Sequence, residues 1–396
     1  MNPGSCSPQD GGTLVGRVWT PGDVPGPSIV SVVAGLAYDL TARAPTMSAL
    51  LEREDAVGIA RDVDGLPLLG HIEEIAMNSV AGSSDPRRPR LLAPCDLQAI
   101  KACGVTFMIS LIERVIEERA GGDPGKAEAL RQMLSAEIGE NLRDVRPGSA
   151  RAGSLKEALI AKGMWSPYLE VAIGPDAEVF TKSQVLSAVG HGSEIGIHPD
   201  SAWNNPEPEI VLAVDSRGTI RGATLGNDVN LRDVEGRSAL LLGKAKDNNA
   251  SCAIGPLLRL FDERFTLDDV RNCPVSVRVS GPDGFILEAV SEMRQISRDP
   301  ADLVRQAINE HHRYPDGLVL FLGTMFAPVA DRDRPGSGFT HKRGDLVEIA
   351  TPLLGRLANR VGYTHEIPPW EFGISAMMNN LAERGLLGKE RPAGRG

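Results

Sequence analysis

The chain has 396 residues, of which 42% are hydrophobic and 24% are charged. This balance is typical of a folded globular protein and excludes a disordered chain, and the length is sufficient for two domains. The formal net charge of -10 argues against a general nucleic-acid binder, because neutralising phosphates requires an excess of Lys and Arg.

The five cysteines are odd in number and lack CxxC spacing. A disulfide framework or a zinc site is therefore not expected, and a reducing compartment fits best. Residues 1–13 lack a basic segment followed by an apolar one, and no apolar run is long enough to span a membrane. We therefore expect a cytoplasmic protein with neither a nucleic-acid nor a membrane partner.

The amino-terminal part begins with short alternating runs interrupted by Pro and Gly, which predict strands at 12–20, 25–33 and 34–41. A polar stretch at 82–94 predicts a loop. The clearest helical pattern spans Gly104 to Arg119, where apolar residues recur at helical spacing before Gly121 and Gly122. Two further helices are predicted at 126–138 and 155–164.

From about Trp165 the pattern changes to short strands with Gly and Asp turns, at 168–175, 209–215, 219–226, 275–281, 285–293, 318–324 and 346–352. Helix-like exceptions lie at 251–262 and 299–313. We expect an α+β fold in which a mixed, largely antiparallel β-roll or barrel forms the catalytic domain. The expected divisions are 1–160 (β-rich region plus helical lid), 161–375 (catalytic domain) and 376–396 (helical end and flexible tail).

Three carboxylates are expected to converge on one hairpin. Glu207 and Glu209 lie two residues apart at the start of a predicted strand, so both side chains project from one face. The turn sequence Asp215–Gly218 lets the chain return, and counting back places Asp228 beside Glu207. Taken alone, the ExE pair is better explained as a solvated acidic edge of the hairpin. The matching position of Asp228 favours a functional site instead.

Three gathered carboxylates repel one another, and a hard divalent cation removes that conflict. Mg²⁺ prefers oxygen ligands in an octahedron, so three protein ligands leave positions for a chelating keto acid and a water. The pattern therefore predicts a Mg²⁺ site, with Mn²⁺ as the alternative ion.

The strings PEPE, GNDVNLRD, AKDNNASCAIGP, LFLGT and RGDLVEI, in this order from about His191 to Val361, resemble the fumarylacetoacetate hydrolase superfamily. The strings GTLVGRVW, YDLTARAPT, HPDSAWNNPEPE and LGTMFAPVADRDRPGSGFTHKRGD narrow the resemblance to its 2-keto-3-deoxy-pentonate (D-xylonate or D-arabinonate) dehydratases. This narrower resemblance covers nearly the whole chain.

The resemblance implies a role for several residues. It implies that Glu207, Glu209 and Asp228 ligate the metal and that Lys246 is the active-site lysine, whereas taken alone this residue would be read as a surface lysine. It also implies that Gly323 and Thr324 contact the substrate carboxylate, and that Arg232 and Glu235 line the pocket.

Hydroxy-eliminating relatives fold a helix over the pocket, so the helix at 104–119 is expected to be a lid. Glu117 is our candidate for proton transfer, and Ser110 is a candidate substrate contact; the alternatives are a solvated helix face for Glu117 and a position beside the core for Ser110. His191, flanked by glycines, is weighed evenly between a substrate contact and a structural histidine.

We therefore expect a hydro-lyase that dehydrates a 2-keto-3-deoxy-pentonate to 2,5-dioxopentanoate (2-oxoglutarate semialdehyde) in non-phosphorylative pentose catabolism. The resemblance implies a homodimer or a homotetramer with a small-molecule 2-keto acid substrate. The alternative enzyme is a hydrolase or decarboxylase of a diketo or 2-keto acid on the same fold. The alternative from another class is a binding protein that has lost its chemistry.

Overall fold

The computed structural model describes residues 6–8, 10–121, 123, 125–127, 145–161, 165–326, 328, 330–333 and 338–387. Residues 128–138 of the expected helix at 126–138, and the expected flexible tail beyond Gly388, lie outside these ranges. No helix within them is both long enough and apolar enough to cross a bilayer.

The strands of the first half are β1 (Leu14–Thr20), β2 (Gly26–Val33), β3 (Leu36–Asp39), β4 (Leu68–His71), β5 (Arg90–Leu92), β6 (Ala99–Gly104), β7 (Glu178–Ser183), β8 (Glu194–Ile197) and β9 (Asn204–Asn205). Those of the second half are β10 (Pro208–Val214), β11 (Ile220–Asp228), β12 (Asn230–Leu231), β13 (Cys252–Leu260), β14 (Pro274–Ser280), β15 (Ile286–Glu292), β16 (Leu318–Phe321), β17 (Leu346–Thr351) and β18 (Gly355–Tyr363). The expected strands at the start of the chain are thus confirmed.

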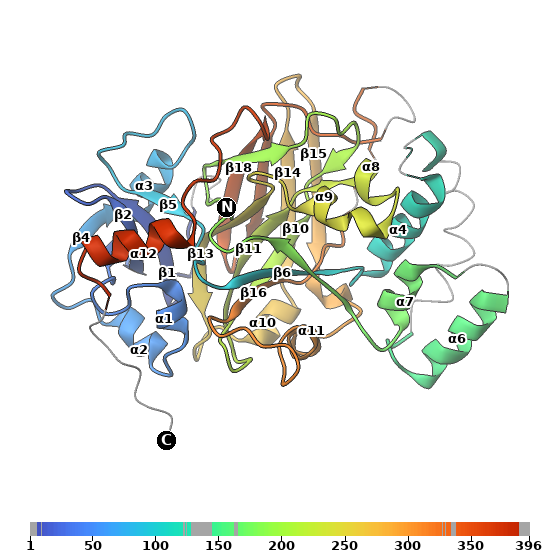
Figure 1. The fold of residues 1–396 in the computed structure, drawn as a ribbon, viewed down its shortest axis with the longest axis horizontal. Coiled ribbons are helices and arrows are strands. Elements are labelled where there is room, and N and C mark those ends of the chain that lie inside the picture. Colours follow the sequence, from blue (N-terminus) through green and yellow to red (C-terminus); the bar gives the residue numbers. More distant parts are fainter. Residues whose placement is uncertain are drawn as a thin grey trace.

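The helices are α1 (Met47–Leu51), α2 (Ala56–Arg61), α3 (Ile72–Asn78), α4 (Met108–Ala120), α6 (Ala150–Ala161), α7 (Pro167–Ile173), α8 (Arg232–Glu235), α9 (Leu242–Lys246), α10 (Leu267–Arg271), α11 (Pro300–Ala307) and α12 (Ile374–Glu383). Two 3₁₀ turns are η1 (Ala239–Leu241) and η2 (Met293–Gln295). In Figure 1, α4, α6 and α7 lie together at the right of the view, and α1, α2, α3 and α12 lie at the left around β1, β2, β4 and β5.

Within the described residues, an 11-stranded sheet runs in the order β4-β3-β2-β1-β13-β11-β10-β16-β6-β7, with β5 paired to β1. A 5-stranded sheet runs in the order β15-β14-β17-β18-β8, and β12 pairs with β9. Among the pairings between these described strands, only β16–β6 and β18–β8 are parallel. The expectation of a mixed, largely antiparallel fold is therefore confirmed.

The expectation of a barrel is wrong for the described strands, because the large sheet has free ends at β4 and β7 and the smaller one at β15 and β8. The two sheets share a buried core instead of closing on themselves through hydrogen bonds. It includes Ile210 and Leu225 from the large sheet and Val277, Ile349 and Val361 from the smaller one. Each such side chain contributes roughly 1.5–3 kcal/mol by leaving water, which holds the sheets together without closure.

Two predictions of secondary structure are wrong, because a helix stands where a strand was expected and a strand where a helix was expected. Residues 168–175 were expected to be a strand, but α7 forms because Ser166 caps it, accepting a hydrogen bond from the Leu169 amide, and Pro167 stands in its first turn. Residues 251–262 were expected to be helical, but β13 lies in the middle of the large sheet with every residue buried. A strand buried on both faces is apolar throughout and lacks the alternation that identifies a half-buried strand.

Candidate metal centre and active site

The hairpin β10–β11 brings the three predicted carboxylates together. Its turn is tied by Asp215, whose side chain accepts hydrogen bonds from the amides of Arg217 and Thr219. At the open end, the Asp228 amide donates to the Glu207 carbonyl at 3.0 Å. The expected register is therefore present, and Asp228 lies directly opposite Glu207.

One oxygen from each of Glu207, Glu209 and Asp228 lies within 4.8 Å of the others. All three residues are buried, with 4%, 2% and 2% of their surface exposed. Burial, then the charges of Asp228 and Glu207, raise the pKa of Glu209 well above its ordinary value. No ion pair of Glu209 occurs among the described residues, so its charge lacks a partner at contact distance.

Glu209 is oriented by the loop after β16. The Gly323 amide donates to Oε2 of Glu209 at 2.6 Å. Gly323 has a φ of 89°, and a Cβ there would lie 2.0 Å from Oγ1 of Thr106, so only glycine fits at this position. The loop thereby directs one oxygen of Glu209 toward the backbone and leaves the other for a ligand.

Two buried lysines face Asp228 from opposite sides. Lys246, at the end of α9, lies 2.9 Å from Oδ2 of Asp228 and also contacts Glu207. Lys182, on β7, lies 3.0 Å from Oδ1 of Asp228. Burial alone would raise the pKa of Asp228, but Lys246 and then Lys182 lower it below its ordinary value, so this carboxylate is charged.

The donor set fits a hard divalent cation. Three buried carboxylates, one of them without an ion pair among the described residues, form an oxygen-only group, which is the kind of donor set that Mg²⁺ or Mn²⁺ prefers. A soft metal is not favoured, because the triad contains no sulfur or imidazole ligand.

The expected lid helix is α4, and it does lie against the site. At its start the Ser110 hydroxyl accepts a hydrogen bond from the Phe107 amide at 3.3 Å and donates to the Phe107 carbonyl at 2.7 Å, and Gly121 ends the helix in the left-handed conformation with φ 63°. Arg114 of this helix donates to Oε1 of Glu207 at 2.6 Å and also lies 2.6 Å from Oε2 of Glu235. The helix thus contacts a carboxylate of the metal centre directly.

Glu117 and Arg232 form a buried ionic link between α4 and α8. Arg232 donates from Nε to Glu117 at 2.7 Å, and Arg114 donates to the other oxygen of Glu117 at 2.7 Å. Burial alone would raise the pKa of Glu117, but Arg114 and then Arg232 lower it. Arg232 also lies over the Trp203 ring, with its central carbon 4.3 Å from the ring centroid.

Glu178, on β7, lines the same cavity as the triad and Lys246, and was not predicted from the sequence. Its backbone pairs with Gly104 across β6–β7, and a Cβ on Gly104 would lie 1.9 Å from Oε2 of Glu178. Burial, then the charge of Glu235, raise the pKa of Glu178 to about 7. A carboxylate with a pKa near neutrality can both take and return a proton.

The other predicted residues divide into two groups. Ser110, Glu235, Gly323 and Thr324 line the cavity that contains the triad, and Arg232 lines a second cavity beside it. His191 lines neither of these cavities. It is buried, its Nδ1 accepts the Ala358 amide at 3.2 Å, and burial lowers its pKa to about 4. The structure thus favours the structural role for His191.

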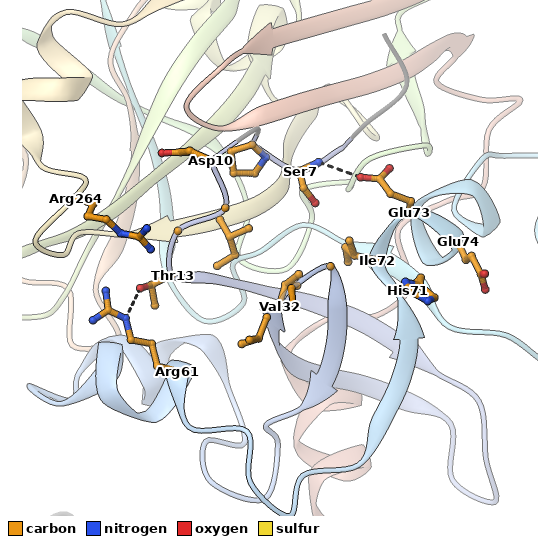
Figure 2. A pocket seen from close by; sticks show the side chains of 17 residues that line it. Ser7, Asp10, Thr13, Val32, Arg61, His71, Ile72, Glu73, Glu74 and Arg264 are labelled. Atoms are coloured by element: carbon orange, nitrogen blue, oxygen red, sulfur yellow. Dashed lines mark hydrogen bonds between the residues drawn. The ribbon is translucent and has the colours of Figure 1, made fainter. Parts of the chain in front are cut away.

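A larger cavity of about 910 Å³ lies away from the carboxylates, among the first strands and α3 (Figure 2). Several of its charged groups are already paired: Arg61 contacts Asp262 and Glu263, and Glu74 contacts Arg88. Size therefore does not identify the reactive site here, and the buried carboxylates do.

Comparison with known proteins finds matches that include the segment containing the three carboxylates. Residues 170–362 match the family model described as fumarylacetoacetate (FAA) hydrolase C-terminal. A 2-dehydro-3-deoxy-D-arabinonate dehydratase of Saccharolobus solfataricus is 32% identical over 193 residues, which are 46% of this chain and 58% of that protein. A Haloferax volcanii protein named "Probable 2-keto-3-deoxyxylonate dehydratase" is 30% identical over 194 residues, 49% of this chain and 63% of that protein. The chain thus spans about three fifths of the length of these curated relatives.

Among solved structures, a 2-keto-3-deoxy-D-arabinonate dehydratase complexed with magnesium and 2,5-dioxopentanoate has a similar fold, with a TM-score of 0.61 at 21% identity. The match covers 88% of this chain and 99% of that one. The chain therefore carries a fumarylacetoacetate hydrolase family domain over residues 170–362.

Proposed function

We propose that the protein is a Mg²⁺-dependent hydro-lyase that removes water from a 2-keto-3-deoxy-pentonate and yields 2,5-dioxopentanoate. The observation that carries this proposal is one cavity in which three metal-ligating carboxylates face both a buried lysine and a carboxylate with a pKa near 7. The names of the two curated relatives and of the structure with magnesium and 2,5-dioxopentanoate support the same reaction.

In this proposal, Glu207, Glu209 and Asp228 hold Mg²⁺. The ion would supply a Lewis acid that polarises the C2 carbonyl of a chelated 2-keto acid. The residues of the chain have three tasks beyond this: to remove a proton from C3, to compensate the negative charge that then develops, and to return a proton to the departing C4 hydroxyl.

We assign the proton transfers to Glu178 rather than to Glu117. Glu117 accepts hydrogen bonds from two arginines, which lower its pKa and make it a weak base. Glu178 has no ion pair among the residues that the structure describes, lines the cavity of the triad and has a raised pKa. Glu178 takes the C3 proton, and the electron pair of that C–H bond forms the C3–C4 double bond. The C4 hydroxyl then leaves as water with the proton that Glu178 returns.

Lys246 compensates the charge on the enolate. Its ammonium group contacts Glu207 and Asp228, and these carboxylates raise its pKa above the ordinary value although burial alone would lower it. It therefore stays charged at neutral pH and acts as a fixed cation rather than as a base. Proton transfer from C5 to C3 then converts the unsaturated alcohol into an enol, and transfer of the enol hydroxyl proton to C4 gives the aldehyde of 2,5-dioxopentanoate.

We also propose the cytoplasm as the place of action, an even homo-oligomer, and a domain division near residues 160 and 375. These follow from the resemblance and from the change in sequence pattern near Trp165. Gel filtration with light scattering checks the assembly, and limited proteolysis checks the division.

The reaction is tested by incubating the purified protein with Mg²⁺ and a panel of 2-keto-3-deoxy sugar acids and 2,4-diketo acids, and by resolving products by mass. Loss of about 18 mass units, with formation of an aldehyde that a semialdehyde dehydrogenase oxidises, is the expected result. Cleavage into two acids with uptake of water would establish the hydrolase alternative, and loss of CO₂ the decarboxylase one.

A further inference from the structure

The cavity that contains the triad is too small for the proposed substrate. Its volume is about 20 Å³, which is enough for about one water molecule. A five-carbon hydroxy keto acid has roughly ten non-hydrogen atoms and needs several times that space. The carboxylate and the C2 carbonyl of the substrate would chelate the metal. The rest of the substrate, C3 to C5, then requires space that this cavity does not provide.

A second cavity of about 20 Å³ lies directly beside the first. The two cavities share four lining residues, Ser110, Arg114, Glu207 and Thr324. Arg114 is the largest of the four, and its guanidinium group crosses to Glu207 and Glu235. The Arg114 side chain thus separates two compartments that would be continuous if it turned away from Glu207.

A divalent cation bound at Glu207 would favour movement of the Arg114 side chain away from that residue. In the described state its guanidinium group is shared among Glu207, Glu117 and Glu235. A cation on Glu207 repels the guanidinium group and competes for the same carboxylate, whereas Glu117 and Glu235 can still hold it. The compartments would then join while Arg114 keeps its other two charge partners, Glu117 and Glu235.

Asn205 lines the second compartment, and one of its side-chain atoms lacks a hydrogen-bond partner. Asn205, on β9, is 2% exposed, and its Nδ2 donates to the Pro206 carbonyl at 3.0 Å. Its Oδ1 accepts no hydrogen bond. A buried acceptor without a donor costs roughly 1–3 kcal/mol, and a ligand that brings a hydroxyl group removes this cost.

We infer that the second compartment, defined by Glu113, Glu117, Asn205, Arg232 and Phe326, receives the far end of the substrate, and that Oδ1 of Asn205 accepts a hydrogen bond from its C5 hydroxyl. The inference rests on the proposed function and makes Asn205 a specificity-determining residue. A site built to bind a hydroxyl rejects analogues that lack it, because its own polar group is left unpaired.

Two ligands that differ by one hydroxyl test this directly. Both 2-oxopentanoate and 5-hydroxy-2-oxopentanoate have the chelating head, and neither has a C4 leaving group. Titration calorimetry with the Mg²⁺-loaded protein gives both dissociation constants without turnover. We expect the hydroxylated ligand to bind at least about tenfold more tightly to the wild type.

The Asn205→Leu variant, similar in volume, should bring that ratio close to one while retaining the affinity for 2-oxopentanoate. Asn205→Ala, which cannot clash, is read in the same way if the leucine variant does not fold. Asn380→Leu is the matched control, because Asn380 on α12 is also buried, its Nδ2 donates to the Pro25 carbonyl, and its Oδ1 is unpaired. It should keep the wild-type ratio.

Equal binding of the two ligands by the wild type, or an unchanged ratio in the Asn205 variants, would overturn the inference while leaving the proposed function intact. Failure of the Mg²⁺-loaded wild type to bind either ligand would overturn the proposed function itself. The two failures are therefore distinguishable in one titration series.

Discussion

Nη2 of Arg114, on the lid helix α4, donates a 2.6 Å hydrogen bond to Oε1 of Glu207, on the metal-site hairpin. The two residues are 93 positions apart, so this contact joins a helix of the first half to the catalytic hairpin. Both residues are largely buried, with 13% and 6% of their side chains exposed. A ligand on Glu207 is therefore expected to change the position of α4.

Removing the guanidinium group should loosen α4. We expect Arg114→Gln to speed amide hydrogen exchange over residues 111–120, because the buried carboxylates of Glu117, Glu207 and Glu235 lose a common partner. Arg119→Gln, on the exposed side of the same helix, is the control and should exchange like the wild type. Equal exchange in the two variants would show that Arg114 does not hold the lid.

Lys246→Met should bind Mn²⁺, as followed by paramagnetic resonance, but lose most of the rate. The triad remains, whereas the developing enolate loses its compensating cation, and the expected loss of kcat is about a hundredfold or more. Normal turnover of this variant would remove Lys246 from the mechanism even if the reaction is assigned correctly.

Glu178→Gln should retain metal and keto acid but lose exchange of the C3 protons in D₂O, measured by NMR. Gly104→Ala should lower the rate as well, although Gly104 has no reactive group, because its Cβ would displace the Glu178 carboxylate. If Glu178→Gln still catalyses exchange of the C3 protons, another residue must remove the C3 proton.

The pH dependence follows from the same carboxylate. Glu178 must be deprotonated to act as a base, and its pKa is about 7 in the metal-free protein. A bound cation lowers this value, so kcat/KM should fall on the acid side with a midpoint at or below pH 7. The residual kcat/KM of Glu178→Gln should not fall on the acid side in this way. An unchanged acid-side fall in this variant would contradict the assignment of Glu178 as the base.

The triad could be predicted because its geometry is local. Glu207, Glu209 and Asp228 belong to one hairpin, and turn position plus strand alternation determine which side chains meet. Glu178 could not be found in this way, because it reaches the site through the pairing of β7 with β6, and no motif accompanies it. Lys182 on the same strand gave no signal for Glu178 either, because its carboxylate partner is Asp228.

The lid illustrates the same limit. The apolar spacing from Phe107 to Ile116 correctly predicted a helix, and its position over the site came from the resemblance. Which of its charged side chains face inward could not be read from spacing, because Glu113 and Glu117 would ordinarily occupy a solvated face. They are buried because Arg232 of α8 pairs with both.

His191 should make stability depend on pH. Its pKa is lowered from 6.5 to about 4, so below pH 6.5 the unfolded chain binds a proton that the folded chain does not. This contribution is present above pH 6.5 and is lost as the pH falls toward 4, by up to about 3 kcal/mol. Urea unfolding at pH 7.5 and 5 measures it, and His191→Asn, which keeps an acceptor for the Ala358 amide, should have a smaller difference between the two values.

The central claim is that three carboxylates hold a Mg²⁺ ion for the dehydration of a 2-keto-3-deoxy-pentonate. The most direct measurement is the mass of the product formed from this substrate by the wild type, by the wild type in excess chelator, and by Glu209→Gln. The account predicts a product about 18 mass units lighter from the wild type alone, restored after chelation by added Mg²⁺. The same product in excess chelator or from Glu209→Gln, or two acids in place of one aldehyde, would contradict it.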